Sequence, residues 1–139
     1  MTAQNRHDRR MDAERLRGIS LFAGLSNKDL SRLAAWTFEV EVPEGMELAT
    51  DGRLAHEFFV IEDGAAAVRK DGVLLRELGP GDFFGEIGLL ETDRRTATVV
   101  ATTPLRVIVM SRTEFRHLEN ELPEVAAVVR AAIKERLGA

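Results

Sequence analysis

The chain has 139 residues, which is the size of one domain with a single substantial hydrophobic core. It carries 19 Lys and Arg against 23 Asp and Glu, a formal net charge of −4, so nonspecific nucleic-acid binding is not expected. Cysteine is absent, which excludes disulfides and thiolate metal sites, and the chain shows no membrane-length apolar run or signal-peptide core, so we expect a cytoplasmic protein.

The first 35 residues predict a helical segment. Residues 5–21 are charged, with a few spaced apolar positions, which predicts a surface helix. Ser26 is typical of a helix N-cap, because an acidic residue, Asp29, follows three positions later. The helix that follows this cap has an apolar face made of Leu30, Leu33 and Ala34.

Over residues 36–110 the hydrophobic pattern becomes that of short strands. Between Trp36 and Val42, apolar residues alternate with polar ones, which predicts a half-buried strand. Asp71-Gly72 lies between two apolar runs and is a strong hairpin signal. Further strands are expected over residues 57–61, 65–69, 73–77, 98–101 and 105–110. The pattern predicts a mainly β domain with flanking helices, built on an antiparallel β-barrel of jelly-roll type.

Residues 111–139 predict two C-terminal helices. Ser111 with Glu114 forms a capping box, and Pro123 occupies a position typical of a first helical residue. The last helix has one apolar stripe, made of Val125, Val128, Val129, Ala132, Ile133 and Leu137. We therefore expect one domain, divided into an N-terminal helical segment, a barrel and C-terminal helices.

The stretch from Gly79 to Val99 contains the residues most suited to binding a ligand. Gly85 and Gly88 flank Glu86, and glycines followed by a short helical turn can present free N–H groups to a phosphate. Arg95 can bond two phosphate oxygens, while the Glu86 carboxylate suits a ribose hydroxyl. The residues alone leave a second interpretation open, a surface loop in which Glu86 and Arg95 form a salt bridge.

The sequence FGEIGLL at residues 84–90, followed by RTAT at 95–98, resembles the phosphate-binding cassette of cyclic-nucleotide-binding domains. That family includes protein kinase A regulatory subunits, bacterial catabolite activator proteins and cyclic-nucleotide-gated channels. The resemblance extends from Gly18 to Leu137 and includes GPGDF at 79–83. It implies a regulatory domain that binds cAMP, with cGMP as a second candidate ligand, and that is not an enzyme.

The resemblance also assigns roles to residues of this cassette, which we place at 84–98. Glu86 accepts a hydrogen bond from the ribose 2′-OH, and Arg95, rather than Arg94, pairs with the cyclic phosphate. In this family the last helix moves as a lid and caps the base, a role for which Arg130 is the candidate. The expected ligand contacts are Phe84, Gly85, Glu86, Ile87, Gly88, Leu89, Arg95, Thr96, Ala97 and Arg130.

Two other functions compete with this one. An enzyme is disfavoured, because His7, His56 and His117 are scattered and no catalytic or metal-ligating set accompanies them. The alternative is a barrel that has lost its ligand and serves as a protein-interaction module. No output domain follows the last helix, so we expect either a protein effector in trans or a chain that is an excised domain.

Overall fold

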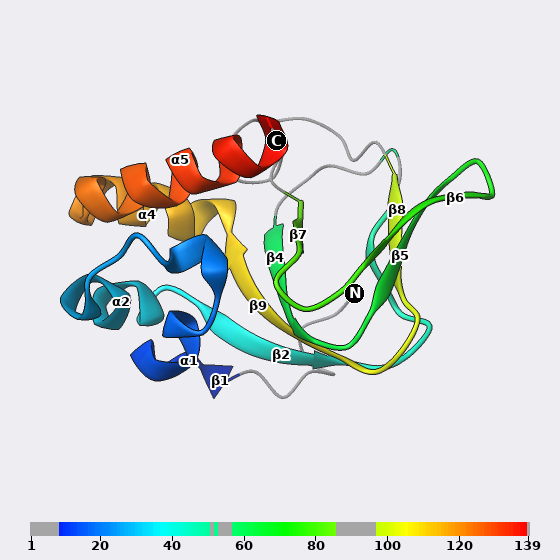
Figure 1. Ribbon diagram of the computed structural model, residues 1–139, viewed down its shortest axis with the longest axis horizontal. Coiled ribbons are helices and arrows are strands. Elements are labelled where there is room, and N and C mark those ends of the chain that lie inside the picture. Colours follow the sequence, from blue (N-terminus) through cyan, green and yellow to red (C-terminus); the bar gives the residue numbers. More distant parts are fainter. Residues whose placement is uncertain (1–8, 51, 53–56, 86–96, 139) are drawn as a thin grey trace.

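The computed structural model describes residues 9–50, 52, 57–85 and 97–138, and its strands form two antiparallel sheets (Figure 1). The five-stranded sheet has the order β1 (Arg9–Arg10), β2 (Phe38–Val42), β9 (Leu105–Ser111), β4 (Glu57–Asp63) and β7 (Phe83–Phe84). The four-stranded sheet has the order β3 (Glu47–Ala49), β8 (Thr98–Ala101), β5 (Ala66–Lys70) and β6 (Val73–Leu78).

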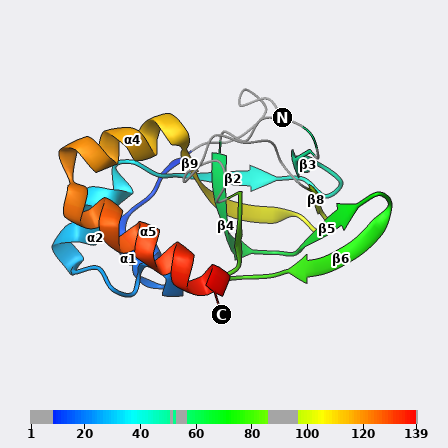
Figure 2. The ribbon, with the colours of Figure 1, turned by 90° about the horizontal axis from the view of Figure 1, so that it is seen from above.

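The helices gather at one end of the molecule, and the hairpin of β5 and β6 extends away from them at the other (Figures 1 and 2). They are α1 (Ala13–Arg17), the 3-10 helix η2 (Ser20–Phe22), α2 (Asn27–Ala34), α4 (Arg112–Glu121) and α5 (Pro123–Gly138). Of the helices in the described ranges, none has the length and apolar character that crossing a membrane would require.

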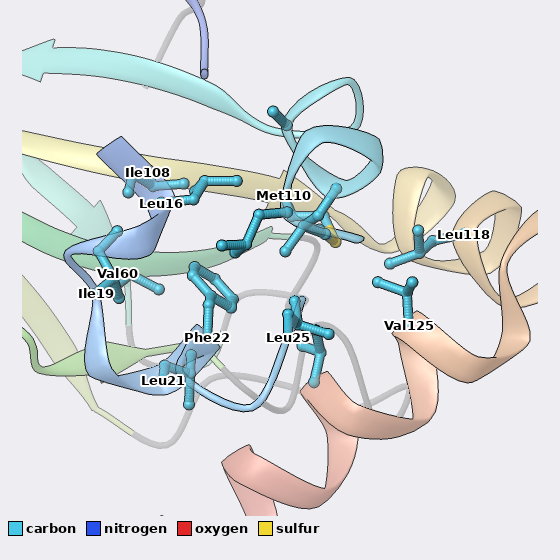
Figure 3. Close-up of a cluster of buried hydrophobic side chains, with 14 of the residues drawn as sticks. Leu16, Ile19, Leu21, Phe22, Leu25, Val60, Ile108, Met110, Leu118 and Val125 are labelled. Atoms are coloured by element: carbon cyan, nitrogen blue, oxygen red, sulfur yellow. The ribbon is translucent and has the colours of Figure 1, made fainter. Parts of the chain in front are cut away.

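One hydrophobic cluster lies on each face of the five-stranded sheet, because successive side chains of a strand point to opposite faces. Phe58 and Val60 of β4 contact the helices, in the cluster shown in Figure 3. Phe59 and Ile61 of the same strand point the other way, into the cluster between the two sheets. This sheet is therefore buried on both faces, which explains the unbroken apolar run at residues 58–61.

Several local predictions are confirmed. Asp71 and Gly72 have φ of 52° and 78°, and two positive φ values are what a type I′ hairpin turn requires. Ser111 and Glu114 form the capping box at the start of α4, and Ser26 caps α2 by accepting from the Asp29 backbone N–H. The structure has the predicted mainly β architecture with flanking helices.

The prediction of one surface helix over residues 5–21 holds, in the described part of that range, only for the short helix α1. α1 begins at Ala13, after the Asp12 cap, while Arg9 and Arg10 pair with β2 as strand β1. Leu16 on α1 is fully buried. The sparse apolar positions are therefore core contacts: Leu16 lies on this short helix, and Met11 and Ile19 lie just before and after it.

The outward face of β2 is also more buried than its alternating pattern predicted. Glu39 is only 1% exposed, because α1 covers it and Arg15 of α1 forms an ion pair with its carboxylate. Arg15 also donates from Nε to Glu62 of β4, at 3.1 Å, and Arg106 Nε of β9 lies 3.5 Å from Glu39 Oε1. This cluster of charges ties α1 to three neighbouring strands.

Candidate functional site

β7 leads directly into the cassette and contacts both hydrophobic clusters. The Phe84 ring is buried and stacks on Phe59, with ring centroids 4.8 Å apart and planes 17° from parallel. The Phe83 ring lies on the other face and contacts Phe58 at 5.5 Å, on the side of the helices. A change in the position of β7 would therefore alter the packing both between the sheets and in the helical layer.

The two ends of the cassette are held by different sheets. Gly85 follows β7 of the five-stranded sheet and has φ of 84°, a conformation that L-amino acids with a side chain rarely adopt. Ala97 precedes β8, which pairs with β3 and β5 in the four-stranded sheet. The segment between Gly85 and Ala97 thus connects the two sheets.

The turn that precedes β7 is fixed to β4 by backbone hydrogen bonds. The N–H of Ile61 donates to the Asp82 carbonyl, and the N–H of Gly81 donates to the Ile61 carbonyl, both at 2.8 Å. The Asp82 side chain accepts from the Gly79 N–H, also at 2.8 Å. These bonds set where β7 begins, and with it the position of Gly85.

α5 packs against the helical cluster with its buried residues Val125, Ala126, Val129 and Ile133. Arg130 is half-buried on the side that faces α4. Its guanidinium forms an ion pair with Glu119 and lies over the Phe115 ring, 5.4 Å from the centroid. In this arrangement α4 supplies the described partners of the Arg130 charge.

The structure describes four of the residues predicted to contact a ligand. Phe84, Gly85 and Ala97 mark the two ends of the cassette, and Arg130 lies on α5. The predicted contacts Glu86, Ile87, Gly88, Leu89, Arg95 and Thr96 lie outside the described residues. The role of each of these residues toward a ligand stays a prediction.

Sequence reasoning missed Phe59, which lies beneath the start of the cassette. Nothing in the run Phe58 to Ile61 distinguishes the ring that supports Phe84 from the ring that faces the helices. Strand β7 has only two residues, which is too short for a periodic pattern, and its pairing with β4 was not predicted either.

Comparison with known families identifies this arrangement. The family model described as "Cyclic nucleotide-binding domain" matches residues 39–121, which is more than half of the chain and contains the whole cassette. The chain belongs to the cyclic nucleotide-binding domain family. The predicted resemblance to this family is confirmed, and its members are regulatory rather than catalytic domains.

Two curated relatives cover most of this cyclic nucleotide-binding domain. The chain is 38% identical over 112 residues to a cAMP-dependent protein kinase regulatory subunit of Eremothecium gossypii, an alignment that covers 79% of this chain and 24% of that protein. It is 31% identical over 120 residues to a cyclic nucleotide-gated potassium channel of Rhizobium etli, covering 86% of this chain and 34% of the channel. The chain thus spans about a quarter of the first relative's length and about a third of the second's.

A solved structure shows the same fold. The cyclic nucleotide-binding domain from Methylobacillus flagellatus superposes with a TM-score of 0.81 at 24% identity, covering 91% of this chain and 74% of that one. The predicted fold class, an antiparallel β jelly roll with flanking helices, is confirmed. In the described part of this chain the strands form two separate sheets and not one closed barrel.

Proposed function

We propose that this cyclic nucleotide-binding domain binds cAMP, does not hydrolyse it, and reports binding through a movement of α5. The observation that carries the proposal is the family match over residues 39–121, which includes the complete cassette. The relative with 38% identity is a cAMP-dependent regulatory subunit, which favours cAMP as the ligand. The two ends of the cassette also follow and precede strands of different sheets, so a ligand bound by the cassette would act on a segment connected to both.

In this proposal the cassette provides the phosphate and sugar contacts. Arg95 pairs with the cyclic phosphate through its two-pronged guanidinium, and Glu86 accepts from the ribose 2′-OH. Gly85, Ala97 and the backbone of residues 87–89 line the sugar and phosphate. The positive φ of Gly85 supports this role, because the absence of a side chain lets the backbone approach a ligand closely.

Isothermal titration calorimetry with cAMP tests the binding, with a phosphodiesterase assay of the same sample as the test for hydrolysis. Truncating one partner of a buried, hydrogen-bonded charge pair costs about 2–5 kcal/mol, so Arg95→Ala should weaken binding about 30-fold or more. Arg94→Ala is the matched control and should bind normally. If the wild-type chain shows no heat with cAMP while folded, the proposal fails and the ligand-free interaction module takes its place.

We propose cGMP as a weaker second ligand, read by Thr96. With the base folded over the sugar, the 2-amino group of guanine reaches the Thr96 hydroxyl, whereas adenine has no donor at that position. Thr96→Ala should therefore lower the affinity for cGMP more than the affinity for cAMP in the same titrations. An equal loss for both nucleotides would assign the hydroxyl to the phosphate alone.

The helix movement is proposed for α5, which starts at Pro123, one residue after the end of α4 at Glu121. A ligand shifts a conformational equilibrium only by its different affinity for the two states. Contact between Arg130 and the base would supply that difference, and it requires Arg130 to leave Glu119 and Phe115. Amide hydrogen exchange over residues 125–137 should slow when cAMP is added. Unchanged exchange at saturating ligand would contradict the proposed lid movement of α5.

The output of the domain belongs to the same proposal. Because this chain matches only a part of its curated relatives, the receiver is either a protein effector in trans or another domain of a longer protein. Cross-linking of α5 in the presence and absence of cAMP, in the presence of a candidate effector, would show whether the effector contacts that helix.

A further inference from the structure

The hairpin of β5 and β6 carries an apolar surface that the proposed function does not use. Val73, Leu74 and Leu75 are 59%, 44% and 55% exposed, and no other large hydrophobic side chain that the structure describes is as exposed. β6 is an edge strand of the four-stranded sheet, so only β5 pairs with it there. Three adjacent exposed aliphatic side chains on a projecting hairpin indicate an interaction surface.

The strand edge of this hairpin is not suited to pairing with another strand. The pairing of β5 with β6 shifts between Val68↔Arg76 and Arg69↔Leu74, which leaves Leu75 as an extra residue in a β-bulge. Bulges and charged side chains are the devices by which edge strands resist strand addition. A partner that covers the apolar side chains at the tip would therefore do so through side-chain contacts and not by adding a strand.

A groove of about 500 Å³ lies near the base of the same hairpin. The exposed Pro43 and Pro104 line its apolar part, with the almost fully buried Val42 and Leu105 beneath them, and it is also lined by Glu41, Asp63 and Arg106. The Gly64 backbone packs against Pro104, and the Thr102 and Thr103 N–H groups donate to the Ala65 carbonyl just before β5 begins. The groove and the hairpin tip therefore lie at opposite ends of β5.

The tip cannot fill the groove of its own chain. The five residues of β5 separate the two, a distance of roughly 17 Å in an extended strand. The hairpin of a second copy of the chain is not subject to this restriction. In a two-fold dimer each contact occurs twice, so two antiparallel hairpins would bring each tip to the other copy's groove at once.

The charges around the two surfaces fit this arrangement. The hairpin exposes three cations, Arg69, Lys70 and Arg76, and two carboxylates, Asp71 and Glu77, for a formal net charge of 3 − 2 = +1. The groove is lined by two carboxylates, Glu41 and Asp63, and by Arg106, for a formal net charge of 1 − 2 = −1. The one arginine that lines the groove, Arg106, already lies beside the buried Glu39. We propose that this chain forms a two-fold dimer in which Val73, Leu74 and Leu75 of one copy occupy the groove of the other.

Analytical ultracentrifugation of the full chain without nucleotide tests the dimer independently of ligand binding. The wild-type chain should show a reversible monomer–dimer equilibrium, and Leu74→Ser with Leu75→Ser should weaken it at least tenfold. These side chains are exposed in the monomer, so the circular dichroism spectrum should not change. Lys28→Glu, an exposed change on α2, is the control and should leave the equilibrium unaltered.

A charge exchange identifies the surface that the tip contacts. One variant carries Arg69→Glu with Arg76→Glu on the hairpin, and a second carries Glu41→Lys with Asp63→Lys at the groove. Each variant alone should dimerise at least tenfold more weakly than wild type, because like charges then meet at both contacts. An equimolar mixture should recover wild-type association, since both contacts again join opposite charges.

Three results would overturn the proposal. The wild-type chain could remain monomeric at protein concentrations up to ~1 mM, which would mean that any dimer has a dissociation constant weaker than ~1 mM. The leucine variant could dimerise as well as wild type, which would place the interface elsewhere. The mixture of charge variants could fail to associate, which would remove the groove as the occupied surface. Because no nucleotide is present, none of these results bears on cAMP binding.

Discussion

Replacing Arg15 with alanine should destabilise this domain far more than the same replacement at Arg17, two residues further along α1. Arg15 forms ion pairs with Glu39 of β2 and Glu62 of β4. Arg17 pairs only with solvent-exposed groups in the described structure, Glu14 at 3.4 Å and the Asn27 side chain at 3.1 Å. The two changes are chemically identical and lie on one short helix, so Arg17→Ala is a matched control.

The expected magnitude follows from burial. Removing one partner of a buried ion pair costs about 3–5 kcal/mol, because it leaves an uncompensated charge. Glu39 is 1% exposed, but the Arg15 side chain is 30% exposed and Arg106 lies 3.5 Å from Glu39, so water and Arg106 offset part of this cost. We expect Arg15→Ala to lower the free energy of unfolding by about 2–4 kcal/mol, against less than about 1 kcal/mol for Arg17→Ala.

Urea denaturation, followed by fluorescence, measures both values. Trp36 is the single tryptophan of the chain and packs against the helical cluster, so its emission reports on the layer that Arg15 holds. A double-mutant cycle with Glu39→Gln isolates the pair. Because the damage comes from a buried charge, Arg15→Ala combined with Glu39→Gln should be more stable than the sum of the single changes by about 1 kcal/mol or more.

Two outcomes would refute this reasoning. Equal destabilisation by Arg15→Ala and Arg17→Ala, within about 0.5 kcal/mol, would show that the buried position of Glu39 does not require Arg15. A coupling energy near zero in the cycle would show that the two side chains act on stability separately.

Three further predictions concern single positions. Gly64→Ala should destabilise the fold by about 3 kcal/mol or more in thermal melts, because the new Cβ would lie 2.3 Å from the Pro104 carbonyl oxygen. Gly72→Ala is the control: Gly72 also has a positive φ, but it lies in open space, so the change should cost only about 1–2 kcal/mol. Ser111→Ala should cost about 0.5–2 kcal/mol in urea denaturation by removing the capping box of α4, and an effect no larger than that of the exposed Thr113→Ala would contradict this. If Glu86 reads the ribose, 2′-deoxy-cAMP should bind at least tenfold more weakly than cAMP in calorimetry, and equal affinities would remove Glu86 from the site.

Much of this domain could be predicted from local sequence, where a few neighbouring residues determine the structure. The Asp71-Gly72 turn requires two positive φ values, which this dipeptide tolerates. The capping box of Ser111 and Glu114 satisfies N–H groups at the start of its own helix, so it depends on no distant residue. The cassette is also a contiguous run of residues, but its chemistry alone leaves a surface loop with a salt bridge as a second interpretation, and the resemblance of its sequence to a known family favours the ligand site.

Which group covers each face of a helix or strand depends on tertiary packing. The alternation in β2 distinguished two faces, but only the packing of α1 made Glu39 a buried residue with an arginine partner. Phe83 and Phe84 are adjacent residues of the same type, so the sequence does not distinguish them. In the paired strand β7, one ring lies against Phe58 on the side of the helices and the other stacks on Phe59 between the sheets. Arg130 was predicted from its place on the last helix, whereas its partners, Glu119 and Phe115, follow from how α4 and α5 pack. A periodic pattern of hydrophobic residues indicates that a side chain is covered, but the group that covers it depends on residues far away in the chain.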